Sequence, residues 1–241
     1  KNPAYKLGLQ CYERILMPYT EDEKDEIGIK MGERAQWVGD ILVRSADEIL
    51  PRDVARRRLG LGDDELVFYV GLGGGGNPQN DDAVDWALDV LAEFPEVRVA
   101  CAAQPLSKGA DRLSERDGVV AVSHYPMMEY FSAFDAAISS AGFNCAELVH
   151  AGVPAIWAPL GHPSTDQEFN ARRFADRGLG IAVKLLDADA LKAAVETLLD
   201  AKKRADMARA MRAWAGPNGA EVAARAILDY LASGEGRVSV L

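Results

Sequence analysis

The sequence predicts an α/β protein with a doubly wound parallel sheet. From about residue 66 to residue 200, short apolar segments alternate with amphipathic ones, which is typical of parallel strands joined by right-handed helical crossovers. Glycine-rich or polar loops follow several of the apolar segments, and ligands of such sheets bind at the carboxyl ends of the strands. A chain of 241 residues with 49% hydrophobic residues is also long enough and apolar enough to bury a core.

The composition excludes several classes of function. The chain has 37 acidic and 27 basic residues and a net charge of -10, which argues against nucleic acid as the main ligand. Its three cysteines, Cys11, Cys101 and Cys145, lack the spacing of a metal site, so we expect a reduced, cytoplasmic protein without a bound metal. No apolar run approaches the roughly 20 residues of a membrane span.

Residues 1–45 contain too little apolar surface to form a core of their own. They offer one strand within 13–19, an acidic stretch at 20–26 and a short apolar piece at 36–43. Because the chain also begins at Lys1, we expect this segment to be the tail of a larger N-terminal domain. An N-terminal extension packed on a single domain is the alternative.

The next elements are a helix, a strand and a second helix. The helix within 51–61 begins with a proline and closes on Gly60, and the strand 66–71 leads into a glycine loop and a long amphipathic helix. The loop fits the G-x-G-x-x-G pattern of dinucleotide sites, but the strand at 97–105 ends without the acidic residue that binds ribose. A dehydrogenase is therefore a distant alternative, and a loop that lets the helix pack closely on the strand is another.

Alternation continues to the end of the chain. We expect a strand at 97–103, a helix at 106–116, a strand at 119–125, a helix at 126–134 and a strand at 134–139. Three amphipathic helices, 188–199, 202–214 and 220–233, complete the pattern.

The stretch from residue 139 to residue 183 carries the most specific functional signal. The strand ending at Ser139 turns at Gly142 and enters a helix at 144–150. The first N–H groups of a helix have no partner inside it and the dipole adds positive charge there, so a phosphate can dock at 142–145. About one turn further, Glu147 can accept hydrogen bonds from two neighbouring hydroxyls, as on a ribose.

These elements resemble the nucleotide-sugar-binding signature of GT-B glycosyltransferases, both MurG-type enzymes and UDP-glycosyltransferases. The matching elements are SAGFN, the Glu before the AGVP turn, the AP turn and DQEFNA, read as DQ-x-x-NA. The resemblance implies a Rossmann-like domain that is the C-terminal half of a GT-B architecture. It also implies transfer of a hexose from a nucleoside-diphosphate sugar, UDP- or dTDP-linked, to an acceptor hydroxyl by metal-independent displacement, with no cofactor besides the donor.

The resemblance assigns a donor-binding role to each matching position. The expected contacts are Gly142, Phe143, Asn144, Gly73 and Gly74 for the diphosphate, Glu147 for the ribose, His124, Tyr125 and Met128 for the base, and His162, Asp166 and Gln167 for the sugar. From Gly142 to Glu147 the chain has one residue fewer than the family pattern. Met128 can equally be a core side chain of its helix. The catalytic base is expected outside this segment and is not assigned.

The resemblance also implies a domain organisation. Residues 1–45 would be the tail of an N-terminal acceptor domain with a linker, 46–215 the nucleotide-sugar-binding domain, and 216–241 a C-terminal helix packing back toward the N-terminal domain. The expected partners are the donor, an acceptor molecule, and an N-terminal domain or partner subunit. The high content of Ala, Arg, Asp and Gly suggests a bacterial source.

Two other functions are compatible with the same elements. A nucleotide-sugar epimerase of this fold, such as a UDP-N-acetylglucosamine 2-epimerase, would bind the same donor, and the carboxylates and histidines near 162–168 do not exclude it. A non-catalytic nucleotide-sugar-binding subunit is the second alternative.

Overall fold

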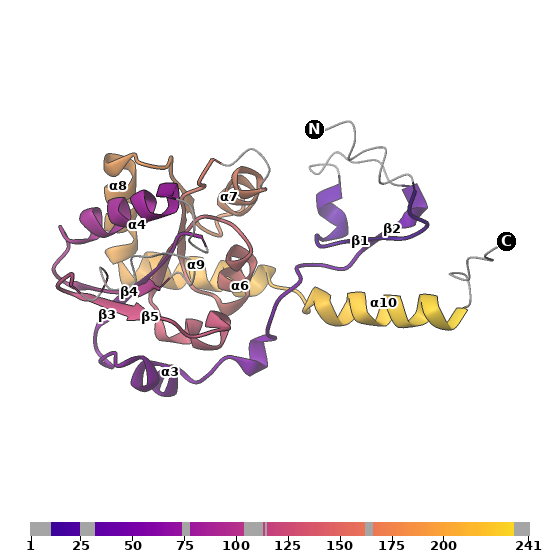
Figure 1. Cartoon of the computed structure of the whole chain (residues 1–241), viewed down its shortest axis with the longest axis horizontal. Coiled ribbons are helices and arrows are strands. Elements are labelled where there is room, and N and C mark those ends of the chain that lie inside the picture. Colours follow the sequence, from indigo (N-terminus) through magenta and orange to yellow (C-terminus); the bar gives the residue numbers. More distant parts are fainter. Residues whose placement is uncertain are drawn as a thin grey trace. The chain divides into compact units, whose positions relative to one another are not determined.

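The computed structural model describes residues 11–24, 32–73, 78–103, 113, 115–161 and 166–233. Most of the helix expected at 106–116 lies outside these residues, as do Gly74 and His162. The chain divides into two compact units, residues 1–45 together with 216–241, and residues 46–215. Figure 1 labels the elements of both units.

The larger unit, 46–215, contains a six-stranded sheet in which every pairing is parallel. The strand order is β5-β4-β3-β6-β7-β8. The strands are β3 (Leu66–Gly71), β4 (Val97–Ala102), β5 (Val119–Val122), β6 (Ala136–Ser139), β7 (Ala155–Trp157) and β8 (Ile181–Ala182). The chain runs outward from β3 to β5, returns to β6 beside β3, and runs outward again, so the predicted doubly wound sheet is confirmed.

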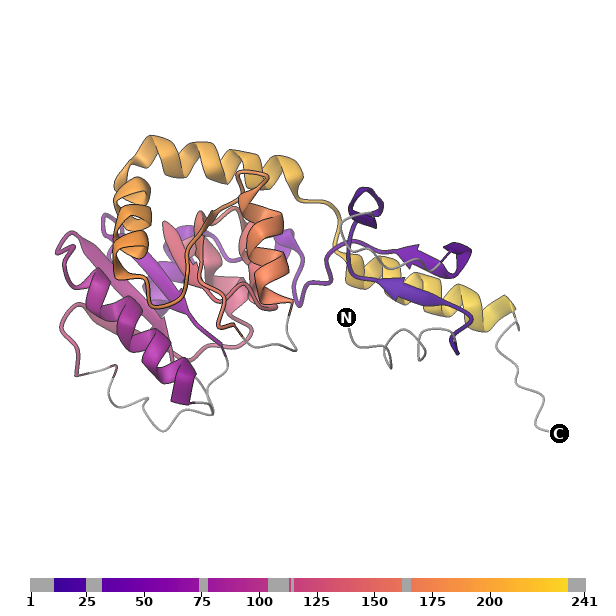
Figure 2. The ribbon, with the colours of Figure 1, turned by 90° about the horizontal axis from the view of Figure 1, so that it is seen from above.

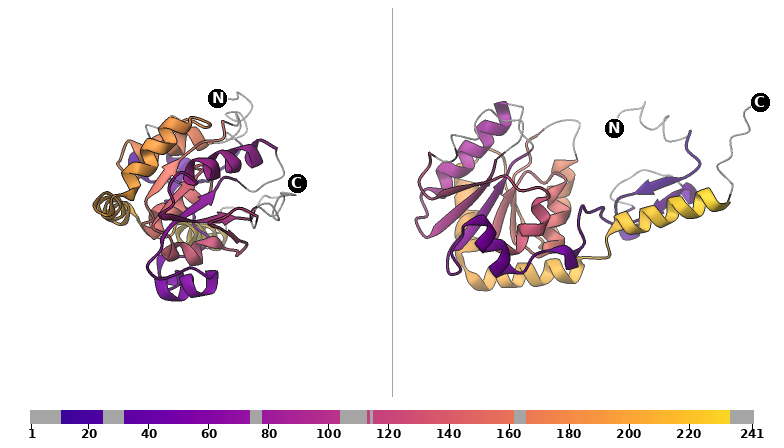
Figure 3. Two further views of the ribbon diagram at one scale, coloured as in Figure 1. Left: turned by 90° about the vertical axis from the view of Figure 1, so that its left-hand side faces the viewer. Right: turned by 60° about the horizontal axis from the view of Figure 1, so that its bottom comes forward.

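Helices cover both faces of this sheet. They are α3 (Arg52–Leu59), α4 (Pro78–Leu91), α6 (Asn144–Ala151), α7 (Gln167–Ala175), α8 (Ala188–Leu199) and α9 (Ala201–Trp214), with short 3-10 helices η3 (Ala46–Glu48) and η4 (Met127–Ala133). In the left view of Figure 3, α4 and α8 lie on one side of the sheet and α3 on the other. The segment expected as a helix at 126–134 is thus present as the 3-10 helix η4.

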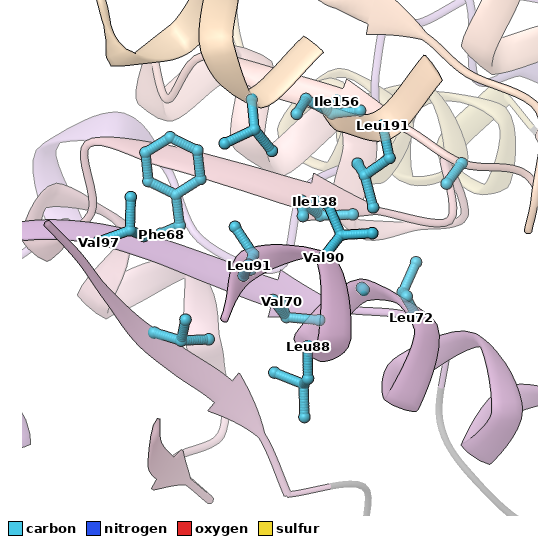
Figure 4. Close-up of a cluster of buried hydrophobic side chains, with 14 of the residues drawn as sticks. Phe68, Val70, Leu72, Leu88, Val90, Leu91, Val97, Ile138, Ile156 and Leu191 are labelled. Carbon is cyan, nitrogen blue, oxygen red and sulfur yellow. The ribbon is translucent and has the colours of Figure 1, made fainter. Parts of the chain in front are cut away.

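The main hydrophobic core lies between the sheet and the pair α4 and α8. Figure 4 shows strand residues such as Phe68, Val70 and Ile138 facing Leu91 of α4 and Leu191 of α8. All five side chains are essentially inaccessible to solvent. Burying a side chain of this size stabilises the fold by about 1.5–3 kcal/mol, so this layer fixes the sheet on which the strand ends are arranged.

A second core, rich in aromatic residues, covers the opposite face. Tyr69 of β3 stacks on Phe134 at 5.0 Å between ring centroids, and Trp157 of β7 lies 5.7 Å from Phe174 of α7. The Phe174 ring in turn meets Trp214 of α9 edge-on at 5.6 Å. Successive side chains of a strand point to opposite faces of the sheet, so the same strands anchor helices on both faces.

The smaller unit pairs two short strands with the last helix. β1 (Ile15–Met17) and β2 (Ala35–Trp37) are parallel, and α10 (Gly219–Ser233) lies alongside them in Figure 2. Tyr230 of α10 donates a hydrogen bond to Glu13 at 2.5 Å. The unit also contains the 3-10 helices η1 (Glu21–Glu23) and η2 (Gly32–Arg34).

Asn218 joins the N-terminus of α10 to the segment before residue 45. Its Oδ1 accepts from the N–H groups of Leu42 and Ala220, and its Nδ2 donates to the carbonyl of Leu42. None of the helices within the described ranges has the length and apolar character that a membrane span requires.

Candidate functional site

The candidate site lies where the strand order of the larger unit reverses, between β3 and β6. Gly71 at the end of β3 is in register with Ser139 at the end of β6, and Ser139 is in register with Trp157 at the end of β7. Because neighbouring parallel strands are about 4.8 Å apart, the loops that follow these three ends lie side by side. Ligands of doubly wound sheets bind at such a reversal.

The turn between β6 and α6 is held by side chains on both sides. The Ser139 hydroxyl accepts a hydrogen bond from the N–H of Ala141 at 3.3 Å and donates to Asn144 Oδ1 at 2.8 Å. Asn170 of α7 donates through Nδ2 to the carbonyl of Ala141 at 3.1 Å. Ala141 has a φ of 56°, a left-handed conformation that is uncommon for a residue with a Cβ.

The beginning of α6 presents N–H groups that the helix itself does not use. Cys145 is the first residue whose N–H bonds back, to the carbonyl of Gly142 at 3.2 Å. The N–H groups of Gly142, Phe143 and Asn144 precede this bond, and the helix dipole adds positive charge at the same place. The turn predicted at 142–144 is therefore present with the geometry that suits an anion.

Among the described residues, nothing crowds the position of a Cβ on Gly142. Its φ is not positive, and of these residues a Cβ would meet the Ser140 hydroxyl at 3.6 Å and Gln167 Nε2 at 3.8 Å. The side chain of Phe143 is fully exposed. The described part of the chain therefore leaves the backbone uncovered at this turn.

Gly73 has a structural explanation instead. Its φ is +84°, and a Cβ there would lie 2.8 Å from Asn80 Nδ2 and 3.3 Å from Leu160. The glycine allows a left-handed turn after β3 and the close approach of α4, as the alternative reading of the glycine loop proposed. Because Leu160 also lies near this hypothetical Cβ, the loop after β7 passes close to the loop after β3.

Glu147 lies on α6, about one turn beyond the N–H groups of residues 142–144, and is half-buried. Burial raises the pKa of Tyr69 on β3, and the nearby Cys101 and Glu147 raise it further. Glu147 is thus close enough to the end of β3 for its charge to act there.

The loop after β7 reaches the same place through Gln167. Gln167 Oε1 accepts a hydrogen bond from the N–H of Leu160 at 2.8 Å, while its Nε2 lies beside Gly142. Asp166 is the exposed N-cap residue of α7. Gln167, predicted to contact the sugar, is therefore a neighbour of Gly142, predicted to contact the diphosphate, although 25 positions separate the two in the sequence.

The three residues predicted to hold a base lie after β5, at the edge of the sheet. His124 and Tyr125 are exposed, and the His124 ring lies 4.6 Å from that of Tyr130. Met128 is fully buried in η4. Its side chain contributes to the core, as the alternative reading stated, and is not available as a wall for a ligand in this structure.

A separate depression of about 510 Å³ borders the outer side of the same region. It is lined by Pro159 and Gly161 of the loop after β7, by Glu168 and Arg172 of α7, by Asp176 directly after that helix, and by residues 182–185 at the end of β8 and beyond it. Its charges are mixed, so the lining favours no single class of ligand. The candidate site proper is the surface at the strand reversal.

Neither metal ligation nor thiol chemistry is indicated at these loops. Among the described residues no three His, Cys, Asp or Glu side chains are grouped so as to hold a metal ion. Burial raises the pKa of Cys101 to about 12, which keeps its thiol protonated. Cys145, at the start of α6, is buried.

Two residues that organise the site were not assigned from the sequence. Ser139 and Asn170 both bond to the turn at Ala141, and their roles depend on the positions of β6 and α7 relative to each other. Asn170 did carry a signal, since it is the Asn of the DQEFNA element.

The chain is similar to known sugar-transferring proteins over most of its length. The model of the glycosyltransferase family 28 C-terminal domain matches residues 82–225. An uncharacterised glycosyltransferase of Methanopyrus kandleri is 30% identical over 194 residues, which cover 78% of this chain and 54% of that protein.

Two further proteins similar to this chain are a curated transferase and a protein with a crystal structure. The UDP-N-acetylglucosamine--N-acetylmuramyl-(pentapeptide) pyrophosphoryl-undecaprenol N-acetylglucosamine transferase of Salinibacter ruber is 31% identical over 185 residues, covering 73% of this chain and 50% of that protein. The crystal structure of MurG from Acinetobacter baumannii shares the fold, with a TM-score of 0.66, 17% identity, and coverage of 95% of this chain and 64% of that one. The chain spans about half the length of the curated relatives it matches.

Proposed function

The chain belongs to the glycosyltransferase family 28 C-terminal domains, and from this premise we propose that it binds the nucleoside-diphosphate sugar donor of a glycosyltransferase. The observation that carries the proposal is the turn at Gly142–Asn144. It presents N–H groups at the strand reversal, beside a glycine whose Cβ position no described residue approaches closer than 3.6 Å.

The remaining loops supply contacts for the rest of the donor. We assign the ribose to Glu147, whose carboxylate can accept two hydroxyl hydrogen bonds, and the sugar to Asp166 and Gln167. The exposed loop with His124 and Tyr125 is assigned to the base. A UDP-linked sugar is favoured because the Salinibacter ruber relative is named for a UDP-N-acetylglucosamine donor.

In the proposed reaction an acceptor oxygen displaces the diphosphate from the anomeric carbon. The bond from the acceptor oxygen to that carbon forms while the bond from the carbon to the phosphate oxygen breaks, and the hydroxyl proton passes to a general base. The N–H groups at the start of α6 stabilise the negative charge that develops on the leaving diphosphate. We expect the base and the acceptor contacts to come from outside this segment.

Calorimetric titration of the chain with UDP, dTDP, GDP and NAD tests the donor site. We expect one nucleoside diphosphate to bind selectively. Glu147→Ala should weaken that binding by about 1.5–3 kcal/mol, or roughly 10- to 150-fold, because charge-assisted hydrogen bonds to the ribose are lost.

A control for the Glu147 variant is Glu196→Ala, which removes an exposed carboxylate from α8 and should leave the dissociation constant unchanged. No binding of any diphosphate would contradict the proposal. NAD binding in their place would instead support the dinucleotide reading of the glycine loop.

A further inference from the structure

Ala141 has the least favourable backbone conformation in the candidate site. Its φ of 56° lies in the left-handed region, and its side chain is completely buried. For a residue with a Cβ this conformation is unfavourable, so neighbouring groups must maintain it.

Two side chains hold the peptide groups of Ala141. Its N–H donates to the Ser139 hydroxyl, and its carbonyl accepts from Asn170 Nδ2. The Ser139 hydroxyl also donates to Asn144, so the turn is fixed at both ends. Asn170 is the only one of these groups that belongs to a distant segment, 29 positions further along the chain.

Asn170 and Gln167 make α7 a common support for two loops. They are three residues apart and therefore lie on the same face of the helix. Gln167 binds the N–H of Leu160 in the loop after β7, and Asn170 binds the carbonyl of Ala141 in the turn after β6. A displacement of α7 would move both loops together.

We propose that Asn170 is a positioning residue for the donor diphosphate, an inference that rests on the proposed function. The side-chain amide of Asn170 holds Ala141 in the left-handed conformation. It thereby sets the direction in which the chain enters residues 142–144. That direction determines whether the N–H groups of Gly142, Phe143 and Asn144 converge on one ligand. Asn170 itself acts through the backbone and need not touch the donor.

Asn170→Ala combined with Ala141→Gly tests this inference in the 241-residue chain. The probe is the nucleoside diphosphate that binds the unaltered chain among UDP, dTDP and GDP. Asn170→Ala should weaken its binding roughly tenfold, since one hydrogen bond that maintains the turn is lost. Adding Ala141→Gly should restore the dissociation constant to within about threefold, because glycine adopts the left-handed conformation without a Cβ penalty.

If Ala141→Gly restores binding to the Asn170→Ala variant, Asn170 positions the turn and does not have to contact the ligand. If Asn170→Ala binds as the unaltered chain does, or if Ala141→Gly fails to restore binding, the inference is wrong while the proposed function stands. If the unaltered chain binds none of the three diphosphates, the proposed function itself is wrong and the inference falls with it.

Two further variants guard against a general loss of structure. Ser139→Ala removes the other support of Ala141 together with the bond to Asn144, so it should weaken binding, and Ala141→Gly should restore that binding only in part. No restoration at all would count against the inference. Asn218→Ala removes comparable amide bonds to the backbone in the smaller unit, and should lower the melting temperature without changing the dissociation constant.

Discussion

At the scale of single residues, two glycines of the larger unit differ in what surrounds them. A Cβ on Gly180 would lie 1.9 Å from Nε1 of the buried Trp157, so packing inside the chain requires glycine there. Among the described residues, a Cβ on Gly142 would meet nothing closer than 3.6 Å. The proposed donor site accounts for glycine at position 142 as a place where a ligand approaches the backbone.

Gly142→Ala should separate binding from stability. We expect the free energy of unfolding in urea to stay the same or rise by about 0.4–1 kcal/mol, because alanine restricts the unfolded chain and fits the folded one. Binding of the nucleoside diphosphate should weaken at least roughly tenfold, since the methyl group would occupy the path of the phosphate.

Gly180→Ala is the matched control for this variant. It should lower the free energy of unfolding by about 1–3 kcal/mol through overpacking against Trp157. An alanine at position 142 that leaves diphosphate binding intact would show that the ligand does not approach this turn.

At the scale of elements, α3 is attached to the segment before β6 by the buried Arg56 and by the more exposed Arg52, which both pair with Asp135. Arg56 donates hydrogen bonds to the carbonyls of Gly62, Ala133 and Glu65, among others, and forms an ion pair with Asp135 at 2.8 Å. Burial lowers the pKa of Arg56, and Asp135 opposes that effect. The Arg56 side chain is buried, so removing it leaves buried polar groups without their hydrogen-bonding partner.

Arg56→Met should therefore destabilise the larger unit by about 3–5 kcal/mol in urea unfolding. Arg57→Met changes the next residue of the same helix, whose ion pair with Asp53 is exposed on both sides. That control should cost no more than about 1 kcal/mol. Equal losses for the two variants would refute the assigned role of Arg56.

The sequence predicted most of these elements because their signals are local. The strands β3, β6 and β7 are almost entirely buried, so they appear in the sequence as short apolar runs. The helix α8 is preceded by Asp187, whose side chain caps it. The helix expected at 188–199 has those bounds in the structure.

Other features depended on contacts that no local pattern reveals. The left-handed Ala141 requires an amide from α7, and the burial of Met128 depends on how η4 packs beneath α3 and α6. The turn at 142–144 could be predicted because it follows from the general properties of a helix N-terminus. The residues that support it could not.

At the scale of the whole molecule, every described residue of the proposed donor site belongs to the unit formed by residues 46–215. The contacts proposed for the donor come from the turn and helix after β6 and the loop after β7, with the proposed base loop after β5. Because the chain spans about half the length of its curated relatives, we propose that donor binding is the part of the reaction located here.

The most direct test of this account is a titration of the ¹⁵N-labelled chain with UDP, followed by the amide signals of all assigned residues. The account predicts that the largest shifts are those of Gly142, Phe143 and Asn144, with smaller ones near Glu147 and Gln167. Shifts centred elsewhere, for example on the depression beside Arg172, would contradict it, as would a spectrum that UDP leaves unchanged.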